Sequence, residues 1–217
     1  MTKAIIADTE YTTWPGALES DWVEPWQEKE IFQLAAIKVD LDGFIETDSF
    51  DRLIIPRLNP QLSDLAVSLT SIPQERLDNE GVSFAQGLKE FFDFTEGGAL
   101  PVICMNGDAA VFRRNCEINN IAFPFAQNFH RLRPFLESQG IDVAKNSSGT
   151  LHLLTDQPLA GHTHYALHDD RSMRSFLAYA QKMGWFTDLS QLPNDLPGRD
   201  PRAEPAPAGG SMKPQIL

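Results

Sequence analysis

Short apolar runs near the start of the chain predict β-strands. Residues 3–9 are rich in isoleucine and alanine, and a run this short is typical of a central strand buried on both faces. Residues 31–39 and 44–55 are predicted as two further strands, and Asp42-Gly43 between them is a hairpin signal. The chain is therefore expected to begin with a central strand followed by an antiparallel pair.

Apolar residues at helical spacing dominate the following segment. Residues 62–95 are predicted to form two or three helices, because phenylalanine and leucine recur there with a period near 3.6. The elements expected after this segment are a fourth strand at 101–105 and helices at 109–119, 130–138 and 165–183. Strands followed by alternating helices and strands indicate an α/β fold with a mixed sheet.

Composition divides the chain into a folded domain, 1–186, and a tail, 187–217. Six of the 15 prolines lie in residues 193–217, so the tail is predicted to be disordered. The folded part contains one unusual insert, residues 11–29, where tryptophans stand among acidic residues and prolines. A chain of 217 residues with 42% hydrophobic and 22% charged residues suits one ordinary globular domain.

Charge and cysteine content narrow the functional classes. The formal net charge is -12, so the chain lacks the general basic surface of most nucleic-acid-binding proteins, and such a partner would be held locally, through metal. The two cysteines make neither a disulfide framework nor a thiolate zinc site. No signal peptide and no membrane-spanning stretch is apparent, and a soluble cytoplasmic protein is expected.

Acidic residues follow two of the predicted strands. Asp8 and Glu10 are two apart on the first strand and therefore share one face, where two carboxylates repel each other unless a cation lies between them. Asp108 follows the fourth strand and opens a helix. Taken alone, Asp8 with Glu10 is better explained as a solvated strand end, and Asp108 as an acid that satisfies a helix N-terminus.

A histidine and an aspartate near the last helix complete the pattern. His164 and Asp169 are five residues apart, and five residues turn a helix by about 500°, so both would lie on one side only if His164 precedes the helix. Three histidines and two aspartates within nine residues also suggest zinc, but no H-E-x-x-H and no cysteine partner accompanies them.

In combination, these residues resemble the DEDDh 3′-to-5′ exonuclease superfamily, which includes RNase T, oligoribonuclease and the proofreading epsilon subunits. The superfamily carries D-x-E on its first strand, an aspartate at the start of a middle helix and H-x4-D near its end. The corresponding residues, in the same order, are Asp8 with Glu10, Asp108, and His164 with Asp169. The resemblance implies an RNase H-like fold, with a central mixed five-stranded sheet flanked by helices.

Other segments resemble the same superfamily, and two positions depart from it. Residues 30–40 and 62–78 are similar to its second strand and its "LS…LTGI" segment, and residues 147–154 are most similar to the RNase T and Eri-type branches. Ser71 stands where glycine is commoner, and Asp170 beside Asp169 leaves the last ligand open by one position, although the x4 spacing favours Asp169.

The resemblance implies a metal-dependent 3′-to-5′ exonuclease. It would hydrolyse terminal phosphodiesters of single-stranded nucleic acid, with RNA slightly favoured over DNA, and release nucleoside 5′-monophosphates. Two divalent cations, Mg²⁺ or Mn²⁺, would be held by Asp8, Glu10, Asp108 and Asp169, with Asp8 bridging the ions. His164 would act as the general base that takes the proton of the attacking water.

Residues just beyond the first strand are candidates for substrate binding. Tyr11, Thr12 and Thr13 are placed to meet the terminal sugar or phosphate, although ordinary loop hydroxyls would explain the threonines equally well. The tryptophans of the insert suit base stacking or a lid packed on the domain.

Two other functions stay open at this point. One is a non-catalytic nucleic-acid-binding module of the same fold, which the presence of all five acid and base positions argues against. The other is an oligoribonuclease acting on very short oligonucleotides. The expected partner is the 3′ end of single-stranded RNA or DNA, with no membrane association. A homodimer and a protein partner of the C-terminal tail are further hypotheses.

Overall fold

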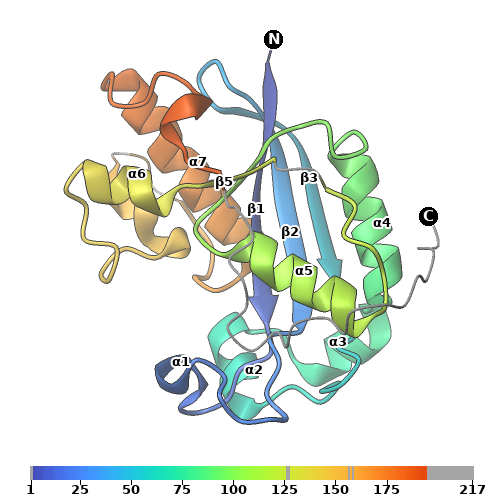
Figure 1. The fold of residues 1–217 in the computed structure, drawn as a ribbon. Coiled ribbons are helices and arrows are strands. Elements are labelled where there is room, and N and C mark those ends of the chain that lie inside the picture. The colour runs from blue at the N-terminus through green and yellow to red at the C-terminus, as the bar shows by residue number, and fades with distance from the viewer. Residues whose placement is uncertain (1, 126–127, 156, 158, 195–217) are drawn as a thin grey trace, which may run out of the picture.

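A five-stranded mixed sheet forms the centre of the molecule (Figure 1). The computed structural model describes residues 2–125, 128–155, 157 and 159–194. The strand order is β3-β2-β1-β4-β5, in which β1, β2 and β3 pair antiparallel and β1, β4 and β5 pair parallel. The strands are β1 (Lys3–Tyr11), β2 (Ile31–Asp40), β3 (Ile45–Leu53), β4 (Val102–Cys104) and β5 (Phe129–Arg131).

Helices cover both faces of this sheet (Figure 1). The α-helices are α1 (Ala17–Ser20), α2 (Asp64–Thr70), α3 (Gln74–Glu80), α4 (Phe84–Phe94), α5 (Asp108–Ile118), α6 (Arg133–Ser138) and α7 (Ala166–Lys182). Two short 3₁₀-helices are η1 (Ser148–Leu154) and η2 (Leu189–Gln191). The expected central mixed sheet flanked by helices is confirmed.

The buried apolar run of β1 explains why both faces of the sheet need helices. Ile5 and Ala7 belong to a core with phenylalanines of α4 and α5, such as Phe91 and Phe112. Alternate residues of β1, Ala4 and Ile6, belong to a second core with Met173, Phe176 and Leu177 of α7. Because strand side chains alternate between faces, one continuous apolar strand supports both cores.

Residues 62–95 form three helices, and a smaller apolar core joins two of them to the sheet. This core contains Ala66 of α2, Leu77 of α3 and Leu62 from the segment before α2. They pack with Phe32 and Leu53 of the sheet. The residue that ends α2, Ser71, has a left-handed backbone with φ of 58°. That conformation favours glycine, which is why glycine is the commoner residue at such a helix end.

The helix predicted at 130–138 is wrong in its first part. Residues 129–131 form β5, which pairs parallel with β4, and α6 begins only at Arg133. A strand of three residues is too short to show a strand period, so only its pairing with β4 defines it. Residues 31–40, 45–53 and 166–182 match the remaining predictions closely.

The folded part of the chain extends past the predicted domain boundary at 186. Leu192 is buried in the α7 core, and Asn194 forms an isolated bridge with His130 of β5. Leu192 of the predicted tail is therefore packed on the domain, although most side chains of residues 187–194 are exposed, and residues 195–217 lie outside the described residues. Among the residues that the structure describes, no helix is long and apolar enough to cross a membrane.

Candidate active site

The carboxyl end of β1 carries the first two acids on the face covered by α7. In the antiparallel ladder Asp8 lies opposite Ala35 of β2, and Glu10 lies opposite Gln33. Two-residue spacing puts both carboxylates on the same side of the sheet, as the sequence predicts. Asp8 is buried and Glu10 is half-buried.

Asp108 reaches the same end of the sheet from the neighbouring strand. It is the first residue of α5, and the preceding Gly107 has φ of 84°, a left-handed conformation in which glycine is favoured. Because β4 runs parallel to β1, their carboxyl ends lie at one edge of the sheet. The Thr9 hydroxyl donates a hydrogen bond of 3.2 Å to Oδ1 of Asp108, which ties α5 to β1.

His164 and Asp169 converge because only one of them is helical. His164 lies in the loop before α7 with a left-handed φ of 69°, and Asp169 is in the first turn of the helix. The backbone N–H of His164 donates to Oδ1 of Asp169 at 3.3 Å, and the Ser148 hydroxyl donates to Oδ2 at 3.1 Å. A Cβ on Gly149 would lie 2.3 Å from Oδ1 of Asp169, so only glycine fits there.

Three of the five predicted residues form a compact group of candidate metal ligands. One ligand atom each of Glu10, His164 and Asp169 lies within 4.8 Å of the others, the one such group among the described residues. Asp108 is close enough for its charge to raise the pKa values of both Asp8 and Glu10. The fold therefore brings all five positions to one end of the sheet.

The electrostatics of this acidic cluster favour a bound cation. Burial and then the charges of Asp169, Asp108 and Glu10 raise the pKa of Asp8 well above its usual range. Burial, followed by the charges of Asp169 and Asp108, raises the pKa of Glu10 to about 9. Burial raises the pKa of Asp169 to about 7 against the lowering effect of its hydrogen bonds. Divalent cations prefer such oxygen donors, and their charge removes the repulsion.

The structure separates the roles of the two adjacent aspartates. Asp170 is completely buried, and neither of its carboxylate oxygens has a hydrogen-bond partner among the described residues. Asp169, not Asp170, belongs to the group with Glu10 and His164. The geometry thus supports Asp169 as the last ligand, as the x4 spacing favours.

His164 differs from the acids in its exposure. Its side chain is exposed at the edge of the cluster, where partial burial and then the neighbouring His162 lower the pKa of its imidazole. A lowered pKa leaves this ring neutral near pH 7, the form that accepts a proton.

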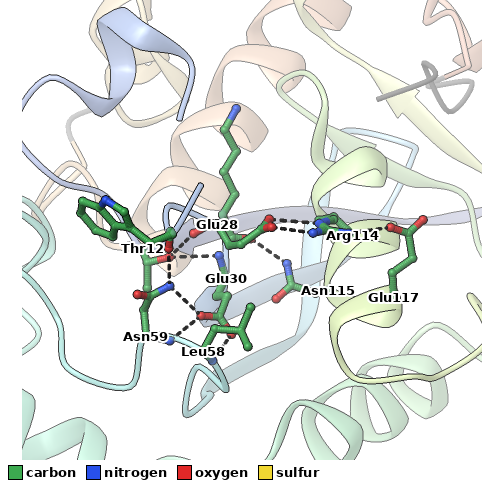
Figure 2. Close-up of polar contacts among 10 residues, drawn as sticks. Thr12, Glu28, Glu30, Leu58, Asn59, Arg114, Asn115 and Glu117 are labelled. Atoms are coloured by element: carbon green, nitrogen blue, oxygen red, sulfur yellow. Dashed lines mark hydrogen bonds and ion pairs between the residues drawn. The ribbon is translucent and has the colours of Figure 1, made fainter. Parts of the chain in front are cut away.

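The three candidate substrate contacts fare differently. Thr12 is buried, and its hydroxyl donates to the carbonyl of Glu28 and accepts from the N–H of Glu30 at 3.0 Å, so it holds the insert (Figure 2). Tyr11 is half-buried, with its ring edge-on to Trp22, and Thr13 is also half-buried. All three stay predicted substrate contacts.

The remaining tryptophans of the insert form a separate pair. Trp14 and Trp26 meet edge to face with ring centroids 4.8 Å apart, and Trp26 stays exposed. Trp22 is buried, and its indole N–H donates to the Thr12 carbonyl at 2.9 Å. Trp22 is therefore structural, while the pair holds one half-buried ring, Trp14, and one exposed ring, Trp26.

Sequence reasoning missed the residues that surround Asp169 and Glu10. Ser148 and Gly149 contact Asp169 from η1, and Gln33 lies opposite Glu10 on β2. Gln33 leaves a visible signal, because it is the polar residue within the apolar run 31–37. Ser148 and Gly149 leave none, because only the tertiary fold brings η1 to the first turn of α7.

One protein family matches most of the chain. The model of the RNase_T family, described as exonuclease, matches residues 5–172. No curated protein sequence matches the chain.

Solved structures with the same fold include three nucleases. The nuclease domain of 3′hExo, a DEDDh family member bound to rAMP, has a TM-score of 0.71 and 19% identity, covering 89% of this chain and 96% of that one. A 3′-exonuclease in a structure of 3′-end-specific recognition of histone mRNA stem-loop has a TM-score of 0.72 and 20% identity, covering 88% and 89%. E. coli Exonuclease I in complex with a dT13 oligonucleotide has a TM-score of 0.62 and 16% identity, covering 83% and 41%.

Proposed function

The chain belongs to the RNase_T exonuclease family and has the RNase H-like fold of DEDDh 3′-to-5′ exonucleases, and on that premise we propose its substrate and mechanism. The enzyme removes single nucleotides from the 3′ end of single-stranded nucleic acid, RNA in preference to DNA, and releases nucleoside 5′-monophosphates. The observation that carries this proposal is the group formed by Glu10, His164 and Asp169 beside Asp8 and Asp108.

The four carboxylates are the proposed holders of two divalent cations, Mg²⁺ or Mn²⁺. Asp8, Glu10, Asp108 and Asp169 supply only oxygen donors, and their mutual repulsion is the structural reason to expect positive charge between them. When bound, such cations activate a water as the nucleophile and offset the negative charge of the phosphate. They also reconcile a polyanionic substrate with a chain of net charge -12.

The chain's own groups position and move the proton. His164 takes one proton from the attacking water. The oxygen of that water bonds to the terminal phosphorus, while the bond from phosphorus to the leaving 3′ oxygen breaks. The leaving oxygen then acquires a proton and becomes the new 3′ hydroxyl. Ser148 and the backbone N–H of His164 each hold one oxygen of Asp169, which fixes the orientation of that carboxylate.

The RNA preference rests on similarity. The RNase T-like and Eri-like segments favour RNA, and of the neighbours with the same fold, one is bound to rAMP and another recognises histone mRNA stem-loop. E. coli Exonuclease I is bound to dT13, so the fold itself accommodates both kinds of strand. The homodimer, the protein partner of the tail and the cytoplasmic location stay predictions.

The test is digestion of 5′-labelled single-stranded RNA and DNA of equal sequence, with Mg²⁺, Mn²⁺ or EDTA. A metal-dependent ladder that shortens from the 3′ end is expected, with RNA degraded faster. Asp8→Asn should abolish the ladder, while Asp48→Asn, which alters an exposed acid on β3, should not. Faster degradation of DNA would reverse the substrate assignment. Cleavage of dinucleotides alone would identify an oligoribonuclease, and binding without cleavage would identify a non-catalytic module.

A further inference from the structure

Gln33 is a fully buried amide within the otherwise apolar run 31–37 of β2. Its Nε2 donates to Oδ1 of Asp51 on β3 at 2.9 Å, and its Oε1 accepts from the backbone N–H of Ala166 at 3.1 Å. Ala166 is the first residue of α7, where a backbone N–H has no partner within the helix. The single Gln33 side chain therefore joins β2 and β3 to the start of the helix that carries Asp169.

Asp51 also holds the residue before that helix. The Tyr165 hydroxyl donates to Oδ2 of Asp51 at 2.7 Å, so each carboxylate oxygen of Asp51 accepts one bond. Arg76 of α3 lies against the same tyrosine, with its guanidinium carbon 5.9 Å from the ring centroid. Tyr165 makes no side-chain cap bond to α7, so its hydroxyl serves the contact with β3 instead.

These contacts lie beside both motif residues, His164 just before α7 and Asp169 in its first turn. Tyr165 immediately follows His164, whose left-handed backbone is unfavourable for a residue with a side chain. Asp169 lies one turn further on and is repelled by Glu10, the cross-strand neighbour of Gln33. Without a restraint, repulsion between Glu10 and Asp169 would drive the start of α7 away from β1.

We propose that Gln33, Asp51 and Tyr165 form a polar latch that holds the start of α7 against the sheet, so that His164 and Asp169 face Glu10. The three are positioning residues, because none belongs to the group of candidate ligands. The inference rests on the proposed function, since it assigns these contacts to the geometry of the metal and proton-transfer site.

Tyr165→Phe tests the latch most directly, because it removes one hydroxyl and keeps the ring. A displaced ligand and base should lower kcat by about tenfold. KM for the oligonucleotide should change by less than about twofold, since the latch acts on the chemical step. The Mn²⁺ concentration for half-maximal rate should rise several-fold, while the Tm of the metal-free protein changes little.

The matched control is Tyr179→Phe, the same change on the same helix. Tyr179 lies near the C-terminal end of α7, where its ring contacts Trp185 beyond the helix, so its hydroxyl is remote from the latch. This variant should keep the wild-type kcat and Mn²⁺ dependence. A loss equal to that of Tyr165→Phe would mean that general softening of α7, not the latch, is the cause, and would overturn the proposal.

A second variant separates the latch from ordinary packing. Gln33→Met keeps similar volume but removes both hydrogen bonds, and the double variant Gln33→Met/Tyr165→Phe should lose little more kcat than the worse single variant. Additive losses would mean that the two residues act independently and would overturn the shared latch.

A readout without catalysis keeps the latch separate from the proposed function. Mn²⁺ should raise the Tm of the wild-type protein more than that of Tyr165→Phe at equal metal concentration. If the wild-type protein degrades no nucleic acid, the proposed function fails. The difference between the two Mn²⁺-induced Tm shifts then still tests the latch. Equal Mn²⁺-induced shifts, or wild-type kcat in Tyr165→Phe, would overturn it.

Discussion

Asp8 has an unfavourable place in the folded protein when no cation is bound. Its carboxylate is buried, and the charges of Asp169, Asp108 and Glu10 oppose its ionisation. Asp8→Asn removes that charge and keeps the shape. In EDTA at pH 8 we expect this substitution to raise the free energy of unfolding by about 1–3 kcal/mol, and with Mg²⁺ or Mn²⁺ present it should abolish turnover. Thermal unfolding of the metal-free proteins measures the first effect.

The exposed substitution Asp48→Asn serves as the control for this stabilisation, because it removes an equal charge outside the cluster. It should leave the free energy of unfolding within about 0.5 kcal/mol of the wild-type value. A lower Tm for Asp8→Asn in EDTA would show that the carboxylate is stabilised by contacts in the metal-free fold, and would contradict the electrostatic explanation.

His164 is expected to affect proton transfer far more than metal binding. His164→Ala should lower kcat by about 10²–10⁴-fold, the usual contribution of a general base. The Mn²⁺-induced rise in Tm should persist, because four carboxylates remain. Partial burial lowers the pKa of His164 from 6.5, so at saturating Mn²⁺, where the carboxylates stay ionised, the wild-type rate should fall only below pH 6.5. Rate measurements from pH 5 to 9 show this limb, which His164→Ala should lack. Loss of the Mn²⁺ shift would make His164 a ligand.

At the scale of elements, the insert between β1 and β2 is held by polar contacts with the loop at 57–59 and with α5. Figure 2 shows Glu30 directed at the backbone near Leu58 and Asn59, while Arg114 of α5 reaches Glu28. Asn115, the next residue of α5, accepts from the N–H of Ile31 and donates to the carbonyl of Lys29. The insert is therefore fixed to the helix that presents Asp108.

Glu30 should contribute more to stability than its neighbours in this network. Its buried carboxylate accepts from the backbone N–H groups of Arg57, Leu58 and Asn59 at 2.7–2.8 Å. Glu30→Gln replaces one acceptor oxygen with a donor that faces those N–H groups. We expect the free energy of unfolding to fall by about 1.5–3 kcal/mol, measured by urea denaturation.

Glu117→Gln is the control, because Glu117 is an exposed partner of Arg114 in the same network. It should lower the free energy of unfolding by less than about 1 kcal/mol. Equal effects of the two substitutions would mean that burial gives Glu30 no special role in holding the loop at 57–59.

Elements with long apolar patterns were predictable from sequence, and those defined by distant partners were not. The helix at 166–182 carries a full apolar stripe, which the sequence alone shows. β5 has three residues and exists only through pairing with β4. The five site positions were predicted by resemblance in order and spacing. The role of Thr12 in holding the insert could not be predicted, because its two hydrogen bonds link it to residues 16 and 18 positions away, contacts that no local pattern reveals.

At the scale of the whole molecule, the acidic cluster should make the metal-free fold less stable as the pH rises. In the folded protein the pKa of Glu10 is raised from 4.5 to about 9, and the pKa of Asp169 is raised from 3.8 to about 7. The folded form therefore binds more protons than the unfolded form between these limits, and stability falls by about 1.4 kcal/mol per pH unit for each extra proton. Below the ordinary values the penalty is absent, and above pH 9 it is complete. The Tm in EDTA should decline from pH 5 to pH 9.

Divalent cations should reverse this decline, because they bind the ionised carboxylates and compete with protons. The Tm difference between Mn²⁺ and EDTA should therefore grow over the same pH range. Glu10→Gln/Asp169→Asn should flatten the EDTA profile and remove most of the Mn²⁺ effect, while Asp48→Asn should keep both. A chain of net charge -12 also unfolds more easily at high pH through general repulsion, which the double variant and the exposed control would share equally. Parallel profiles for the two variants would thus assign the pH dependence to overall charge, and a flattened profile in the double variant alone would assign it to the cluster.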